Sequence, residues 1–325
     1  MRFAVRTISV ILLGVQCAAA QVSVQPRILS VSSSHVLSVP PFTFWSDPGC
    51  DREGNMYFHV GGSAGVEILR VSSDGSTGKT FTIPSRVPDS DKAVFADFSV
   101  APTGAVYVMA GIRGKEEIFR FDEDGKMDDP ISPALPDGVI GTNIAVADER
   151  NILLFGYYDN SSPAEVKGKS YMAVLKPSGE VAQELHITLQ GLDMEQLAAG
   201  EALSPGFALG EDGNFYLAGP SEVLVISQAG ELVRRLPFEN PLPKSTPTRV
   251  HVGGGLVVVV LTSVDNHQVK ADYLVLLAST GDVVGLYEPA PELGQMGDMC
   301  FSPKEGMTFL GVEKKQLRLS TAHFP

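Results

Sequence analysis

Residues 210–237 of the 325-residue chain read GEDGNFYLAGPSEVLVISQAGELVRRLP, and this stretch decides the fold. A glycine turn at Gly213 precedes one apolar strand, and a second apolar strand, Val223 to Ile226, leads into a turn at Gly230. A further strand ends near Pro237. Short strands joined by tight glycine turns form antiparallel hairpins. The stretch therefore predicts two consecutive hairpins, which together make a unit of four strands.

The second of these turns recurs along the chain at intervals of 50 to 54 residues, at Gly75, Gly125, Gly179, Gly230 and Gly281. Another hairpin lies about twenty residues upstream of each turn, for example over residues 50–58 and 101–108. A four-stranded unit buries both faces only when its neighbours stack around an axis. We therefore predict an all-β, six-bladed β-propeller with four antiparallel strands per blade, formed as a single domain by residues 21–325.

The sixth unit indicates how the ring closes, because the chain ends at Pro325 before a fourth strand can form. An unassigned apolar segment, Arg27 to Pro40, is present at the other end of the chain. We predict that this N-terminal strand completes the last blade. Such a closure brings the two termini together and protects an otherwise exposed strand edge.

The first twenty residues have the pattern of a secretory signal peptide. Arg2 and Arg6 precede the apolar run Ile8 to Val15, and three alanines end at Ala20. We expect cleavage before Gln21 and a secreted or periplasmic protein. The apolar run is too short to span a bilayer, and no later segment is long enough, so we expect no transmembrane segment.

The composition excludes several kinds of partner. The chain has 38 acidic and 25 basic residues, giving a formal net charge of −13, and we therefore expect no binding to nucleic acid or anionic membrane surfaces. We also expect a monomer. After cleavage Cys50 and Cys300 remain, one in the first unit and one in the sixth. A disulfide requires Cα atoms within about 7 Å, and the sequence leaves open whether the inner strands approach this closely.

The segment Gly213 to Leu217, followed by a glycine turn, resembles the repeats of six-bladed propellers of the NHL and TolB-like type. The resemblance covers residues 28–325. It implies the propeller architecture, which enzymes, binding scaffolds and sensors all use.

Length variation is predicted on one face of the propeller. The longer connections are 85–92, 157–169, 189–205, 239–247, 263–271 and 290–297. These connections can form a recognition surface, or they can be neutral insertions. Trp45 and Tyr157 fall near this face, where aromatic rings can stack on a sugar, anchor a partner or simply cover the blade edges.

A ring of polar residues is predicted where the channel opens on this face. Counting seven residues back from each first-hairpin turn gives Asp47, Asp97 and Asn143, with Gly206 in the fourth unit and Pro247 or Thr248 in the fifth. The sixth unit gives Asp298 if one residue is inserted in its turn. If the inner strands start at this level, the oxygen atoms could bind Ca²⁺ or another divalent cation. The alternative, which we favour, is that each side chain accepts hydrogen bonds from the backbone of the neighbouring loop that connects two blades.

Two functions follow from these observations. The first is a non-catalytic recognition scaffold that holds a protein or a small-molecule ligand over the channel, without a cofactor. The alternative is a metal-assisted hydrolase or lyase, similar to secreted lactonases of this architecture, that uses the Asp/Asn ring. A serine hydrolase is disfavoured, because Ser63 in its Gly-x-Ser-x-Gly context joins two predicted strands instead of starting a helix.

Overall fold

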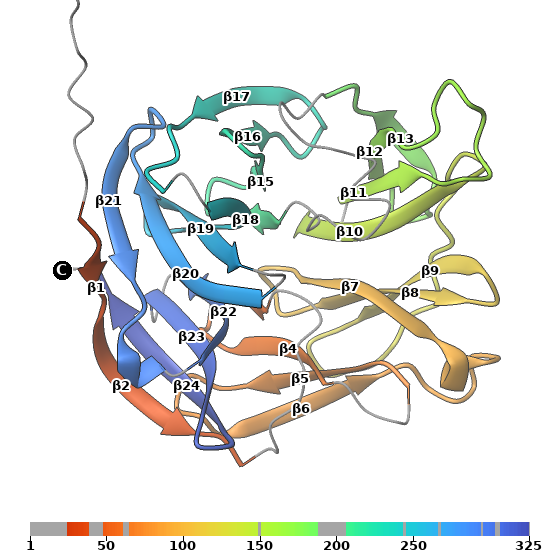
Figure 1. Cartoon of the computed structure of the whole chain (residues 1–325). Helices are drawn as coiled ribbons and strands as arrows, with labels where there is room; N and C mark the ends of the chain where they lie inside the picture. Colours follow the sequence, from red (N-terminus) through yellow and green to blue (C-terminus); the bar gives the residue numbers. More distant parts are fainter. Residues whose placement is uncertain are drawn as a thin grey trace, which may run out of the picture.

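The computed structural model of the protein describes residues 25–38, 48–60, 65–148, 151–187, 206–242, 245–265, 268–293, 295–302 and 306–324. Six small sheets are arranged around a central axis (Figure 1), which confirms the predicted all-β, six-bladed propeller. Two single-turn 3-10 helices, η1 (Ser90–Lys92) and η2 (Pro291–Leu293), lie in connections between blades.

Blades one to three follow one another along the first half of the chain, and their strands are numbered from the channel outwards. Blade one holds β3 (Gly49–Cys50), β4 (Met56–Val60), β5 (Glu67–Val71) and β6 (Thr77–Thr82). Blade two holds β7 (Val94–Val100), β8 (Val106–Ile112) and β9 (Lys115–Phe121). Blade three holds β10 (Val139–Asp148), β11 (Asn151–Tyr158), β12 (Ser170–Leu175) and β13 (Val181–Glu184).

Blades four to six continue the same order and take in the N-terminal strands. Blade four holds β14 (Phe207–Leu209), β15 (Phe215–Ala218), β16 (Glu222–Ile226) and β17 (Leu232–Pro237). Blade five holds β18 (Ser245–Gly253), β19 (Leu256–Asp265), β20 (Gln268–Leu277), β21 (Val283–Glu288) and β1 (Arg27–Ile28). Blade six holds β22 (Gln295–Ser302), β23 (Gly306–Glu313), β24 (Gln316–His323) and β2 (Ser30–Val36).

The hydrophobic core is divided into six clusters, one between each pair of neighbouring blades. The cluster between blades one and two, for example, contains the fully buried rings of Tyr57, Phe81 and Phe121. Successive clusters join blades two to six in chain order, and the last one packs Leu310 of blade six with Met56 of blade one. Because alternate side chains of each strand face opposite neighbours, each blade contributes to two clusters and the ring is closed.

The N-terminal strand completes blade six, as predicted. Strand β2 pairs antiparallel with β24, with Ser30 opposite His323 and Val36 opposite Arg318, and the two strands lie side by side in Figure 1. Leu29 and Leu37, which flank β2, are both buried in the core. The sequence did not predict the preceding strand, β1, which pairs in parallel with β21 and links the N-terminal segment to blade five as well.

Blade two departs from the predicted four strands. Outside β9 the structure has only two isolated bridges, Ile118 with Ile131 and Phe121 with Met127. The sequence there contains Pro130 and Pro133. Proline has no backbone N–H to donate to the sheet, so a continuous fourth strand does not form.

The predicted connection 263–271 is wrong. Strands β19 and β20 extend to Asp265 and from Gln268, so they are joined by a short hairpin turn. The corresponding hairpins of blades two and six are also tight, with Arg113 and Lys314 in the left-handed region. Among the described connections, the longer ones are therefore 159–169 in blade three and several of the links between blades.

The structure shows that the two cysteines predicted to remain after cleavage pair with each other. Cys50 and Cys300 form a disulfide with a Cα–Cα distance of 5.9 Å, which joins β3 of blade one to β22 of blade six. Among the described residues, no helix has the length and hydrophobicity needed to cross a bilayer.

Candidate functional site

The six inner strands surround a central channel with a cavity of about 870 Å³. Residues of all six strands line it: β3, β7, β10, β14, β18 and β22. The volume lies in the range of roughly 300–1,000 Å³ that is typical of ligand pockets. The channel is therefore large enough to admit a small molecule.

A β-bulge recurs in four of the inner strands and sets the position of the polar residues. The register shifts by one residue just before Asp97, Asn143, Arg249 and Asp298. We call these residues, together with Gly206 of blade four, the ring positions. A bulge adds one residue to one strand of a pair and bends it locally. Blades two to six thus present their ring positions at the same point of the repeat.

The structure corrects the predicted ring in two ways. In the fifth blade the ring position is Arg249, not Pro247 or Thr248, because β18 and β19 are joined by a two-residue turn that is shorter than the corresponding turn of blade two. The inner strands of blades two, three, five and six also start earlier than expected, whereas β14 begins directly after Gly206. Strand β7 begins at Val94, three residues before Asp97, so Asp97 lies within the channel wall and not at the start of its strand.

Asp97 has a clear structural role. It is 9% exposed, and its Oδ2 atom accepts a hydrogen bond from the backbone N–H of Ile144 in β10 at 2.9 Å. Two residues further along β7, the Ser99 hydroxyl oxygen accepts a hydrogen bond from the Val146 N–H at 3.0 Å. Blade two therefore fixes the inner strand of blade three through side-chain acceptors.

The other predicted site residues lie in different places. Asn143 lines the channel next to Asp97. Tyr157 is half-buried on β11, where it pairs with Ile140, and it is not among the residues that line the cavity. Asp47 and Trp45 lie outside the described residues, as does Ser63, and only the backbone of Asp298 is described.

The inner strands of blades two and three begin with exposed aliphatic residues, and we call this end of the channel the rim. Val94 and Ile140 occupy equivalent positions three residues before Asp97 and Asn143, and they are 69% and 37% exposed. Tyr157 pairs with Ile140 beside this rim. Neither Val94 nor Ile140 is among the residues that line the cavity, so these aliphatic side chains lie outside the channel wall.

The two walls formed by blades two and five differ in charge. Blade two contributes Asp97 and Ser99, whereas blade five contributes Arg249 and His251 at the equivalent points of β18. Sequence reasoning missed both residues of blade five. The sequence does contain a pattern that could have identified them. Polar and apolar residues alternate from Arg249 to Val252, which is typical of a strand with one face on a core.

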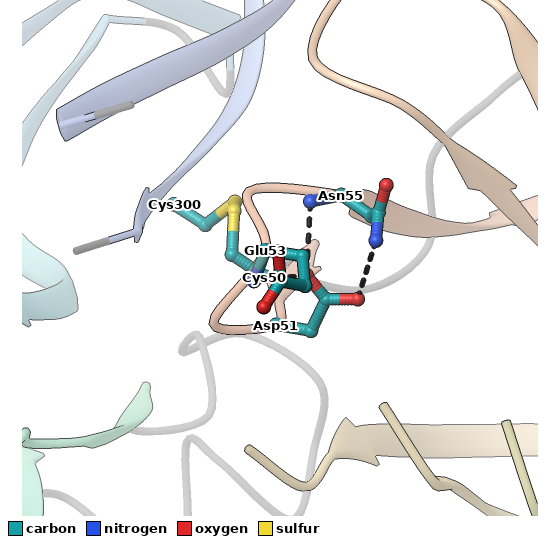
Figure 2. The surroundings of a disulfide bond; sticks show 5 residues. All are labelled: Cys50, Asp51, Glu53, Asn55 and Cys300. Atoms are coloured by element: carbon teal, nitrogen blue, oxygen red, sulfur yellow. Dashed lines mark hydrogen bonds between the residues drawn. A yellow bond between two sulfur atoms is a disulfide. The ribbon is translucent and has the colours of Figure 1, made fainter. Parts of the chain in front are cut away.

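A second polar cluster lies where the chain turns from β3 into β4 (Figure 2). The buried carboxylate of Asp51 accepts hydrogen bonds from the backbone N–H groups of Glu53 and Asn55, from the Asn55 side chain and from the Tyr57 hydroxyl. Burial, followed by the charge of Asp51, raises the pKa of Tyr57 well above its usual range. These bonds hold the turn that follows Cys50.

His59 is a buried histidine outside the channel. It is 7% exposed and stacks on Phe95 of blade two, with ring centroids 3.8 Å apart. Its Nδ1 atom has no hydrogen-bond partner in the described part of the chain, and burial lowers the pKa of the imidazole to about 4. The ring is therefore neutral at physiological pH and serves as part of the packing between blades one and two.

Among the side chains that the structure describes, no three His, Cys, Asp or Glu residues are grouped closely enough to hold a metal ion. The described ring positions with polar side chains are Asp97, Asn143 and Arg249. A guanidinium at one of these positions repels a cation, whereas it attracts an anionic or strongly polar organic group.

No family model and no curated protein matches the chain in sequence. Its structure is similar to that of regucalcin from Agrobacterium tumefaciens, described as a calcium-binding protein, with a TM-score of 0.57 at 10% identity over 91% of this chain and 95% of that chain. It is also similar to a luciferin-regenerating enzyme, with a TM-score of 0.55 at 10% identity over 89% and 95% of the two chains. A putative gluconolactonase has a TM-score of 0.54 at 14% identity over 91% and 94%. These similarities extend over nearly the whole propeller, and they show that this chain has the fold of a six-bladed β-propeller.

Proposed function

We propose that this protein is an exported recognition scaffold that binds its ligand at the channel opening on the side of Val94 and Ile140. The observation that carries the proposal is the cavity of about 870 Å³, which all six blades line and in which Asp97, Asn143 and Arg249 occupy equivalent ring positions. Convergent polar groups in one large cavity are typical of a binding site. Within the β-propellers, the repeated hairpins favour the NHL or TolB-like type.

Export is supported by the disulfide between Cys50 and Cys300, because disulfides persist in oxidising compartments. The proposal expects a mature protein that begins at Gln21. N-terminal sequencing and intact mass of the protein recovered from the medium or the periplasm test this expectation. A mature cytosolic protein that retains residues 1–20 would contradict it.

The binding face can be tested by site-specific photocrosslinking in the producing cell. The photoreactive residue p-benzoyl-phenylalanine is placed at Tyr157, beside the rim, and in a control at Val233, which is 56% exposed on the outer strand of blade four. We expect an adduct of defined mass at position 157 and none at position 233. Adducts at 233 alone, or at neither position, would overturn the proposal.

The alternative of a metal-assisted hydrolase or lyase uses Asp47, Asp97, Asn143 and Asp298 as cation ligands. Arg249 at the fifth ring position favours the scaffold instead, since its positive charge opposes a divalent cation in the same ring. Metal analysis of the purified protein decides between the two. A stoichiometric cation that is lost in Asp97→Ala, while Ser99→Ala retains it, would favour the enzyme.

A further inference from the structure

We infer that the channel binds a small hydroxy acid, with its carboxylate held by Arg249 of blade five and its hydroxyl groups by Asp97 and Asn143. This inference rests on the proposed function and names the chemical class of the ligand. The residues that carry it are all among those that line the channel.

The first step is that the charged walls face one another. The six core clusters join consecutive blades into a closed ring, so blades two and five lie diametrically opposite. Asp97 is thus opposite Arg249, and Ser99 is opposite His251 at the next channel-lining position. A molecule that spans the channel meets a carboxylate on one side and a guanidinium on the other.

The second step is that the walls between the two charged walls, formed by blades three and four, carry several small residues. The inner strands of blades three and four contribute small residues to the lining: Ala145, Ala147, Gly206, Ala208 and Gly210. At Gly206 a Cβ atom would lie only 2.8 Å from the Cα atom of Arg249, so any side chain would force β14 away from β18. The ring position of blade four therefore carries no side chain, and the backbones at Gly206 and Arg249 pack closely together.

The third step concerns the charge of the whole protein. A formal net charge of −13 repels anions at long range, so an anionic ligand must be selected by local contacts. Arginine provides such a contact, because its planar guanidinium matches a carboxylate with two parallel hydrogen bonds. His251, two residues along the same strand, adds a second nitrogen-bearing group to this wall.

The fourth step identifies the other end of the ligand. The Asp97 carboxylate is held in place by its bond to the Ile144 N–H, and the Ser99 oxygen is held by the Val146 N–H. A carboxylate accepts several hydrogen bonds, and a serine that accepts one can donate its own proton to another oxygen. Together with the amide of Asn143, this wall presents oriented acceptors and donors, which suit the hydroxyl groups of a polyol.

The test compares pairs of ligands that differ only in a carboxylate. Isothermal titration calorimetry measures binding of D-glucuronate against D-glucose and of D-galacturonate against D-galactose, using the disulfide-bonded mature protein. We expect at least one acid to bind about tenfold more tightly than its neutral partner, which corresponds to ~1.4 kcal/mol. Arg249→Gln should abolish this preference, and Arg249→Lys should retain part of it.

Arg113→Gln is the matched control, because Arg113 is an exposed arginine on the tight turn of blade two, paired with Asp89. It should leave the preference unchanged, and the melting temperatures of all variants establish that they fold. If no acid binds more tightly than its neutral partner, or if Arg249→Gln keeps the preference, the inference is wrong. The proposed function is judged separately, since the adduct at position 157 does not depend on the charge of the ligand.

Discussion

Two interfaces between neighbouring blades are held together in different ways. Blades six and one are joined by the Cys50–Cys300 disulfide on the channel side, and blade six itself is completed by β2 from the N-terminus. In the described residues, neither a disulfide nor an N-terminal strand takes part in the contact between blades two and three. Instead, three side chains of blade two accept hydrogen bonds from backbone N–H groups of β10: Asp97 and Ser99 of the inner strand β7, and Glu116 of β9.

The difference follows from the order of the chain. Blades two and three are consecutive, so the polypeptide already keeps them close, and polar side chains only need to fix the register of β10. Blades six and one are brought together from opposite ends of the sequence, and the disulfide spans 250 residues. Bringing such distant segments together costs more conformational entropy, which a covalent link reduces in the unfolded state.

The largest effect is therefore expected from removing the disulfide. The double variant Cys50→Ser, Cys300→Ser should lose about 3–5 kcal/mol of unfolding free energy, because the closed loop is so long. Thermal unfolding of the mature protein measures the loss. Wild-type protein treated with a reductant is the control and should show the same decrease. An unchanged melting temperature in both samples would show that strand β2 closes the ring by itself.

The strand closure can be tested independently of the disulfide. Leu37 is 4% exposed at the end of β2, and Leu37→Ala should cost about 2–4 kcal/mol through lost burial and the cavity that remains. Its neighbour Val36 is 46% exposed, so Val36→Ala is the matched control and should change stability by less than about 0.5 kcal/mol. Denaturant unfolding measures both, and equal losses would contradict a specific role for the buried position.

Most of the fold could be predicted from the sequence, because it depends on short-range patterns. The 50 to 54-residue spacing of the glycine turns sets the number of blades, and the missing last strand indicates where residues 27–40 belong. The parallel pairing of β1 with β21 could not be predicted in this way. It depends on the path of the N-terminal segment between two blades, which no local periodicity records.

The interface between blades one and two offers a third type of contact, a neutral histidine packed on an aromatic ring. Burial lowers the pKa of His59 to about 4, whereas the unfolded imidazole titrates near 6.5. The unfolded state therefore binds more protons between these values. Stability is fully present above pH ~6.5 and should fall as the pH decreases towards 4, by about 3 kcal/mol in total.

Unfolding free energies measured from pH 7.5 to 4 test this expectation. The variant His59→Leu keeps an apolar side chain against Phe95 and removes the titrating group, so the difference between the wild type and the variant isolates the histidine. This difference should change by about 1.4 kcal/mol per pH unit below pH ~6. A constant difference over the whole range would show that His59 does not titrate as inferred.

The candidate site was less predictable than the fold. Counting back from the turns found Asp97 and Asn143 but missed Arg249, because the two-residue turn of blade five shifts the count. The recurrent β-bulge has no signature in the sequence, since it consists of one additional residue whose identity differs from blade to blade. The sequence analysis predicted that side chains such as Asp97 accept hydrogen bonds from backbone. The donor to Asp97, the Ile144 N–H, belongs to the inner strand β10 and not to a connecting loop.

The smallest effect is expected at Glu116, a half-buried residue whose charge and hydrogen-bond acceptor can be tested separately. Its Oε1 atom accepts the Gly141 N–H at 2.7 Å, while burial raises the pKa of the carboxyl group. A raised pKa in the folded state means that ionisation at pH 7 opposes folding, and stability should fall as the pH rises through the carboxyl range. Glu116→Gln keeps the acceptor and removes the charge, so it should be neutral or stabilise the protein by up to ~1 kcal/mol at pH 7.

Glu116→Ala leaves the Gly141 N–H without its acceptor and should cost about 1 kcal/mol. If Gln is as harmful as Ala in denaturant unfolding, the charge itself contributes to the interface between blades two and three, and that interface depends on an ionised carboxylate instead of a neutral acceptor.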